Sequence, residues 1–146
     1  MFKQITVFLE NKPGRLEEVT GCLAGEKINL HALSIADKTD FGILRMIVSD
    51  PDKAERVLGE RGLMVRTTDV IAVSIGHNPG SLHKVLRELK TLDISIEYMY
   101  AFTSRHADHD AIVIFRLDAQ EAALDRLKDS GIKVLNQELL DSLNEA

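Results

Sequence analysis

The chain has 146 residues, of which 45% are hydrophobic and 28% charged, a composition typical of an ordinary globular protein. Its formal net charge of −5, with basic residues scattered along the chain, argues against nucleic-acid binding, which needs a basic surface. Cys22 is the single cysteine, so no intramolecular disulfide can form, and we expect its thiol to be buried or inert. No apolar stretch reaches the ~18 residues that would span a membrane. Met1 leads directly into a strand pattern without a leader peptide, so the expected location is cytoplasmic.

The first predicted element is a strand at residues 5–9, Ile-Thr-Val-Phe-Leu, which is rich in β-branched residues. A turn follows at residues 11–16, with the sequence Asn-Lys-Pro-Gly-Arg-Leu. Apolar residues at helical spacing from Leu16 to Leu23 then predict a helix. Proline suits the first turn of a helix, where its missing N–H has no intrahelical partner, and Asn11 is the candidate for capping this helix.

Residues 28–36 and 42–48 are predicted to form a pair of strands, with a polar hairpin loop at residues 37–40 between them. A second helix should end at Gly62, because glycine readily adopts the left-handed conformation that follows many helices. Val65 marks the last strand of this first series.

The whole series then repeats. His-Asn-Pro-Gly-Ser-Leu at residues 77–82 lies 66 residues after the first turn. The apolar positions stay in register, pairing Leu16 with Leu82, Val19 with Val85, Leu23 with Leu89, Ile28 with Ile94, and Leu30 with Ile96. A repeat of this length indicates two copies of one small unit, which we assign to residues 1–68 and 69–146.

The second copy predicts the same elements in the same order. Its strands are expected at residues 70–75, 94–103 and 111–117 and at Val134. Its helices carry Leu82 to Leu89 and Ala123 to Leu127, with Gly131 ending the second of them and Asn78 as the cap of the first. We expect a polar hairpin loop at residues 105–110 and a short helical tail at residues 138–146.

Strand-helix-strand-strand-helix-strand is the order of the split βαβ motif. It predicts an α+β protein of two ferredoxin-like units, each a four-stranded antiparallel sheet with its helices on one face. The third strand of each unit, at residues 43–48 and 112–115, is apolar almost throughout, as is typical of strands covered on both faces. Since the helices cover only one face, we expect a homodimer in which a second copy covers the other.

Two such units, each opening with a strand, a Pro-Gly turn and a helix, resemble ACT domains in tandem. The resemblance extends from about Gln4 to Leu135 and leaves no room for a catalytic domain. It implies a non-catalytic, regulatory sensor of a small molecule, most often an amino acid, that acts on an enzyme or regulator still to be identified. No cofactor, nucleic acid or membrane is expected. The resemblance also implies that edge strands join the units side by side into one eight-stranded sheet.

In this family, the ligand lies at the seam between the strand-to-helix turn of one unit and the second strand of the other. The start of a helix suits an α-carboxylate independently of the resemblance, because it presents unpaired N–H groups and the positive end of the helix dipole. Gly14 and Gly80 would let a ligand approach the backbone closely. We therefore expect two pseudo-equivalent sites. The first comprises Asn11, Lys12, Pro13, Gly14, Arg15 and Leu16 with Tyr98, Met99 and Tyr100, and the second comprises His77, Asn78, Pro79, Gly80, Ser81 and Leu82 with Leu33, Ser34 and Ile35.

Several alternatives remain open. Tyr98 and Tyr100 alternate with Ile94, Ile96 and Phe102 and would equally suit an inward, core-facing side of their strand. The Pro-Gly turns would also suit plain helix starts in a ligand-free interaction module that pairs through its sheet face.

A metal-responsive sensor is a further, weaker alternative. His106 and His109, with neighbouring aspartates, have side chains that suit zinc or nickel, although a solvated hairpin loop explains them more simply. His77 is the histidine best placed for a ligand contact, because it opens the second turn. No enzyme is indicated, since the Gly-x-Ser-x-Gly, His-Glu-x-x-His and P-loop patterns are absent from the sequence.

Overall fold

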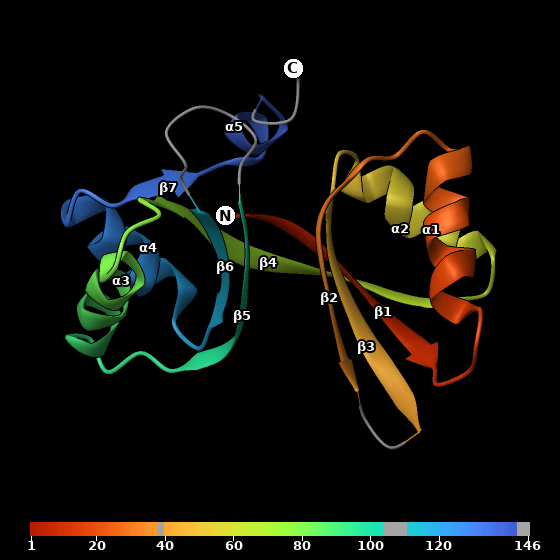
Figure 1. The fold of residues 1–146 in the computed structure, drawn as a ribbon, viewed down its shortest axis with the longest axis horizontal. Coiled ribbons are helices and arrows are strands. Elements are labelled where there is room, and N and C mark those ends of the chain that lie inside the picture. The colour runs from red at the N-terminus through yellow and green to blue at the C-terminus, as the bar shows by residue number, and fades with distance from the viewer. Residues whose placement is uncertain (38–39, 104–110, 143–146) are drawn as a thin grey trace. The chain divides into compact units, whose positions relative to one another are not determined.

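Figure 1 shows the computed structural model of the chain, which describes residues 1–37, 40–103 and 111–142. The described residues form seven strands and five helices, which confirms the α+β class. The elements, in chain order, are β1 (Phe2–Glu10), α1 (Arg15–Gly25), β2 (Leu30–Asp37), β3 (Phe41–Val48), α2 (Pro51–Glu60), β4 (Met64–Ile75), α3 (Ser81–Lys90), β5 (Ile96–Thr103), β6 (Ala111–Leu117), α4 (Gln120–Asp129), β7 (Lys133–Leu135) and α5 (Gln137–Ser142).

The chain divides into two compact units. The first unit is Lys3–Thr68, and the second unit is Asp69–Ala146 together with Met1–Phe2. β4 runs without a break through the boundary after Thr68, so the last strand predicted for the first repeat and the first strand of the second are one element. For this reason the described residues contain seven strands rather than eight, and the expected eight-stranded sheet is not confirmed.

The first unit has its strands in the order β2-β3-β1-β4, with β3 antiparallel to both β1 and β2. Figure 1 shows α1 and α2 together on one side of this sheet. Side chains alternate between the two faces of a strand, and paired residues such as Ile5 and Met46 face the helices. The buried residues of this core are Ile5, Val7, Leu9, Val19, Cys22, Leu23, Ile28, Leu44, Met46, Val48, Ala54, Val57 and Leu58. The burial expected of Cys22 is thus confirmed.

The second unit has the corresponding order β5-β6-β4-β7, and all three of its strand pairs are antiparallel. Its core is formed with α3 and α4 by Ile71, Val73, Val85, Leu89, Val113, Phe115, Leu117, Ala123 and Leu127. Gly62 after α2 and Gly131 after α4 have φ angles of 81° and 75°. Both glycines therefore end their helices in the left-handed conformation, as the sequence predicts.

The third strand of the second unit, β6, is buried on both faces, as its composition predicts. Val113 and Phe115 belong to the helix-side core, whereas Ile112 and Ile114 alternate with them and are fully buried too. These four side chains are buried in a single chain. The homodimer expected from the apolar third strands stays a prediction.

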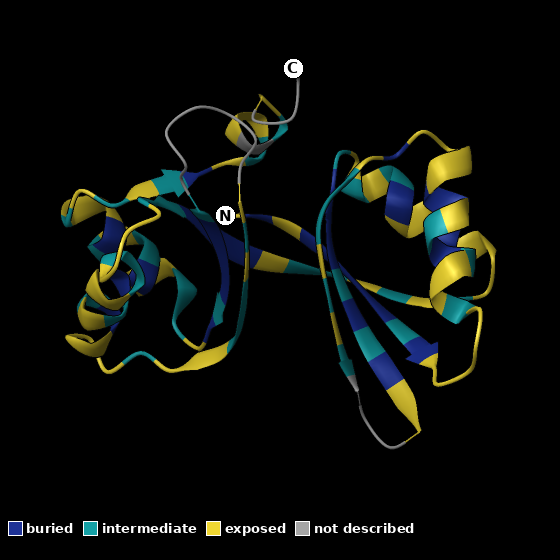
Figure 2. Ribbon diagram, in the orientation of Figure 1, coloured by how far each residue is buried: buried dark blue, intermediate teal, exposed yellow. Residues whose placement is uncertain are grey.

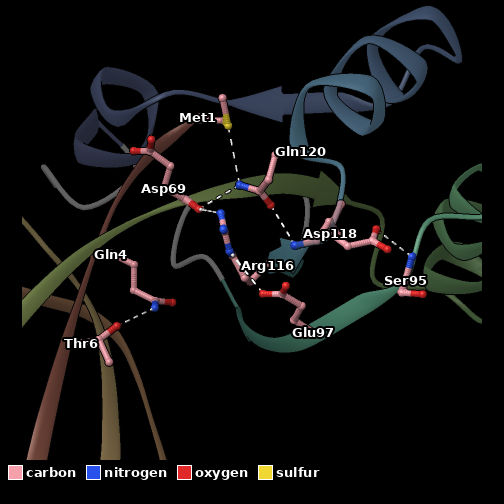
Figure 3. Close-up of polar contacts among 10 residues, drawn as sticks. Met1, Gln4, Thr6, Asp69, Ser95, Glu97, Arg116, Asp118 and Gln120 are labelled. Carbon is pink, nitrogen blue, oxygen red and sulfur yellow. Dashed lines mark hydrogen bonds and ion pairs between the residues drawn. The ribbon is translucent and has the colours of Figure 1, made fainter.

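A glutamine at the start of α4 fixes the beginning of the second unit (Figure 3). The backbone carbonyl of Asp69 accepts hydrogen bonds from Nε2 of Gln120 at 2.8 Å and from Nη1 of Arg116 at 2.9 Å. Oε1 of Gln120 accepts a bond of 2.8 Å from the backbone N–H of Leu117. One side chain therefore ties β4 to the end of β6 at the point where α4 begins.

Figure 2 shows buried residues on the strands and on the inward sides of the helices, with exposed residues on the outward sides and in the turns. Two large apolar residues of the edge strand β2 depart from this pattern, since Leu33 is 47% and Ile35 is 53% exposed. Within the described ranges, no helix has the length and apolar content needed to cross a membrane.

Candidate functional site

Both Pro-Gly turns lead into their helices through a glycine in the left-handed conformation. α1 begins at Arg15 and has Gly14 at its N-cap with φ 87°, while α3 begins at Ser81 and has Gly80 at its N-cap with φ 89°. Glycine adopts this conformation without the strain that a side chain would introduce. The requirement for glycine at these two positions is therefore set by the backbone itself.

The predicted caps of both helices are wrong. No side chain makes a capping hydrogen bond at the start of α1 or α3, so neither Asn11 nor Asn78 is a cap. Pro13 and Pro79 lie one residue before the N-cap rather than in the first helical turn. The cap position is taken by a glycine, which has no side chain to accept a bond. The backbone N–H of Arg15 instead donates to the carbonyl of Lys12 at 3.4 Å, and that of Ser81 donates to the carbonyl of Asn78 at 3.2 Å.

Four charged side chains gather at the first turn. Oε2 of Glu10 lies 3.0 Å from Nζ of Lys12 and 3.7 Å from Nη2 of Arg15. Nη1 of Arg15 also donates to Oε2 of Glu18 at 3.1 Å. The hydrogen bond from Lys12, and the charges of Lys12 and Arg15, lower the pKa of Glu10 from its ordinary value. The cluster holds two positive and two negative charges, so its formal charge is zero.

The first turn lies between two pockets of the first unit. One, the α1–β4 pocket, has a volume of about 410 Å³ and is lined among others by Phe8, Glu18, Phe41, Arg61 and Met64. The other, the α1–β2 pocket, has a volume of about 200 Å³ and is lined among others by Asn11, Lys12, Leu16, Ile35 and Gly42. Both share Leu9, Glu10 and Arg15. The charged cluster of the turn is therefore accessible from both sides.

The α1–β4 pocket has an apolar wall beside its charges. The rings of Phe8 and Phe41 lie 6.2 Å apart between centroids, at an interplanar angle of 59°. Phe41 remains 39% and Met64 67% exposed, which is unusual for side chains of this size. This pocket could not be predicted from the local pattern, because Phe41, Arg61 and Met64 lie far from the Pro-Gly turn in the chain.

The structure places several of the predicted site residues within their own units. Ile35, which we expected at the second turn, lines the α1–β2 pocket beside Asn11 and Leu16 of its own unit. At the second turn, residues 77–80 are exposed, while Leu82 packs against the core of the second unit.

For β5, the structure decides the alternative given for the two tyrosines. The inward face suggested for Tyr98 and Tyr100 is wrong, because Met99 packs against the core and the two tyrosines, on the other face, are half-buried. A β-bulge between Ile96 and Tyr98 shifts the alternation that Ile94 had set. Bulges of this kind leave no mark in an apolar alternation pattern.

A third pocket lies at the second turn, and we name it the α3–β7 pocket. It has a volume of about 270 Å³, and Ser74, Ser81, Lys84 and Lys133 are among its lining residues. Sequence reasoning identified only Ser81 among these four. For metal ions, the residues that the structure describes hold no group of three or more histidines, cysteines or carboxylates suited to ligation. His106 and His109 lie outside the described residues.

These features define a two-unit α+β protein in which each repeated Pro-Gly turn borders a small pocket. A family model described as "ACT domain pair" matches residues 1–143, and the chain belongs to this family. The resemblance inferred from the two turns is thereby confirmed.

Solved structures agree with this assignment. Protein BT0572 from Bacteroides thetaiotaomicron is 45% identical over 95% of this chain and 94% of that chain, with a TM-score of 0.88. The regulatory subunit of aspartate kinase from Thermus thermophilus, in its ligand-free form, is 19% identical over 88% and 91% of the two chains, with a TM-score of 0.63. A structure of aspartokinase alpha and beta subunits is 20% identical over the same shares, with a TM-score of 0.61. The last two show a common fold alone. A search of curated proteins finds no match.

Proposed function

We propose that this protein is a non-catalytic sensor that binds an amino acid at the first Pro-Gly turn and thereby regulates amino-acid metabolism or transport. Membership of the ACT domain pair family supports this proposal, as does the fold shared with a regulatory subunit of aspartate kinase. The ligand would act by changing the assembly of the protein or its contact with a partner enzyme or regulator.

The charge balance of the first turn carries the proposal. A free amino acid has one carboxylate and one ammonium group, and the turn offers both kinds of partner around Arg15. Lys12 and Arg15 suit the carboxylate, while Glu10 and Glu18 suit the ammonium group. A neutral zwitterion adds no net charge to a neutral cluster. The apolar wall of Phe8 and Phe41 would accommodate the side chain of the ligand.

The edge strand β2 supports a role in assembly. Its exposed Leu33 and Ile35 form an apolar strip on a strand whose outer backbone groups are open to pairing. We propose that edge strands join ACT units side by side into an eight-stranded sheet, and that the protein forms a homodimer. A ligand bound against such a seam would stabilise the assembled form by its higher affinity for that form.

The experiment is a thermal-shift screen of the purified protein against the twenty amino acids and several divalent metals. A ligand at about 100 times its dissociation constant adds about 2.7 kcal/mol of stability, which raises Tm by several degrees. We expect one or a few related amino acids to do so, and Arg15→Gln to remove the shift. Arg56→Gln is the matched control, because Arg56 lines neither pocket of the first turn and forms an exposed ion pair with Glu60 on α2.

The other outcomes have definite meanings. Protein that no amino acid stabilises would contradict the sensor and favour the ligand-free interaction module. A shift with metals alone would instead favour a sensor that uses His106 and His109.

A further inference from the structure

The α1–β4 pocket and the α3–β7 pocket occupy the same place in the two units. Each is bounded by the end of the first strand, the start of the first helix, and the glycine and following residues that lead from the second helix into the last strand. Gly62 and Gly131 are the corresponding glycines. The pocket is thus a repeated feature of the fold.

The chemistry of the two pockets has diverged at almost every polar position. Where the first pocket has Phe8, Glu10, Arg15, Glu18 and Met64, the second has Ser74, Gly76, Ser81, Lys84 and Lys133. The first pocket therefore contains both signs of charge and an apolar wall. Among the described residues that line the second, two are lysines, two are serines and none is acidic.

The two lysines are uncompensated. Neither Lys84 nor Lys133 forms an ion pair with any residue in the described ranges, whereas Arg15 of the first pocket is held between two carboxylates. Lys84 also lies near the start of α3, where a positive charge opposes the helix dipole and the first turn has no acidic residue. α1 has Glu17 and Glu18 in the same turn. A bound anion would provide an ion-pair partner for both lysines and would offset the unfavourable interaction of Lys84 with the helix dipole.

The space in the pocket limits the size of this anion. Its volume of about 270 Å³ lies below the range of pockets for drug-sized ligands. Two polar side-chain atoms lie close to Gly76 at the end of β4, since a Cβ built there would be 2.9 Å from Nδ2 of Asn78 and 3.5 Å from Oγ of Ser81. Figure 1 shows the segment that contains Gly76, between β4 and α3, passing beside β7.

We propose that the α3–β7 pocket binds a small oxyanion with two negative charges, a phosphate group or a dicarboxylate, held chiefly by Lys84 and Lys133. This site is distinct from the amino-acid site of the first unit and does not depend on it. The protein would then respond to two chemically different ligands through two copies of one pocket.

The test measures binding of inorganic phosphate and of succinate by isothermal titration calorimetry, with sodium chloride at matched ionic strength as the reference. We expect Lys84→Ala and Lys133→Ala each to weaken binding about tenfold or more, as expected when one charge-assisted hydrogen bond is lost. Lys90→Ala is the matched control, since Lys90 is an exposed lysine of the same helix outside the pocket. All three positions are exposed, so the variants should fold normally.

A preference between the two probes tells which oxyanion geometry the pocket favours. Equal weakening in all three variants, or heat no larger than that from chloride, would mean an adventitious ion only and would overturn the proposal. Any amino-acid shift seen in the thermal screen should persist in Lys84→Ala, so failure of this site and failure of the amino-acid site are separable.

Discussion

The carboxylate of Glu88 on α3 accepts a hydrogen bond of 2.9 Å from Nε of Arg126 on α4. The same oxygen accepts a bond of 2.9 Å from the hydroxyl of Ser130 and lies 2.9 Å from Nη2 of Arg126. These contacts join α3 and α4 of the second unit outside their apolar core. The bond from Ser130, followed by the charge and hydrogen bond of Arg126, lowers the pKa of Glu88 against the opposing effect of desolvation.

The first prediction concerns the pH dependence of this contact. A carboxyl whose pKa is lowered in the folded state stabilises the protein above its unfolded pKa and loses that contribution as the pH falls through the folded value. We therefore expect Glu88→Gln to lower Tm at pH 7 and to have little effect at a pH well below 4.5, the ordinary pKa of glutamate. Thermal denaturation across this range is the measurement. A difference in Tm that is the same at every pH would show that the charge of Glu88 is not involved.

The general fold was predictable because it depends on periodic patterns. The apolar alternation and the two glycines Gly62 and Gly131 indicated the elements and their ends, and the repeat indicated two units. The predictions that were wrong depend on the backbone conformation at single positions. The bulge before Tyr98 reverses which face of β5 is inward, and the glycine caps remove the role given to Asn11 and Asn78.

Only one wall of each pocket was predictable from the sequence, for a different reason. The Pro-Gly turns are adjacent in sequence and were identified directly, but their opposite walls come from distant elements. Arg61 and Met64 reach the first turn because β4 lies beside β1, and Lys133 reaches the second because β7 pairs antiparallel with β4. Such a contact between distant residues has no local signature in a single sequence.

The second prediction separates the two uses of glycine in this chain. Gly14 has φ 87°, so Gly14→Ala should destabilise the protein by about 1–2 kcal/mol, although a Cβ there would meet no neighbouring atom. Gly59 lies in α2 with equally open space around its Cβ position and no positive φ. Gly59→Ala should therefore stabilise the protein by about 0.5–1 kcal/mol. Urea denaturation measures both, and equal effects of the two substitutions would contradict the assigned backbone conformation.

The third prediction follows from the position of Lys84 near the start of α3. Replacing it with glutamate places a negative charge near the positive end of the helix dipole, which typically adds about 0.3–1 kcal/mol at low ionic strength. Lys84→Glu should thus raise Tm in chloride buffer while abolishing the response to phosphate. The combination of greater stability with lost binding would not arise from damage to the fold. If Lys84→Glu still responds to phosphate, the anion binds at another place on the protein.

The last prediction tests whether Glu10 recognises the ammonium group of the ligand. Its carboxylate lies beside Arg15 at the edge shared by both pockets of the first turn, and Lys12 holds its pKa below the ordinary value. Glu10→Gln removes the negative charge but keeps a side chain of the same size. We expect the wild-type protein to prefer its amino acid over the analogue that lacks the amino group, and Glu10→Gln to lose most of this preference.

Because folding lowers the pKa of Glu10, the preference should persist at pH 5 and decline only as the pH falls through that lowered value. Calorimetric titration with the two ligands measures this preference. Glu55→Gln is the control, since Glu55 lines neither pocket of the first turn and accepts an exposed hydrogen bond from Thr67. If Glu10→Gln discriminates as well as the wild type, the ammonium group is bound by another residue, and Glu18 is the next to replace.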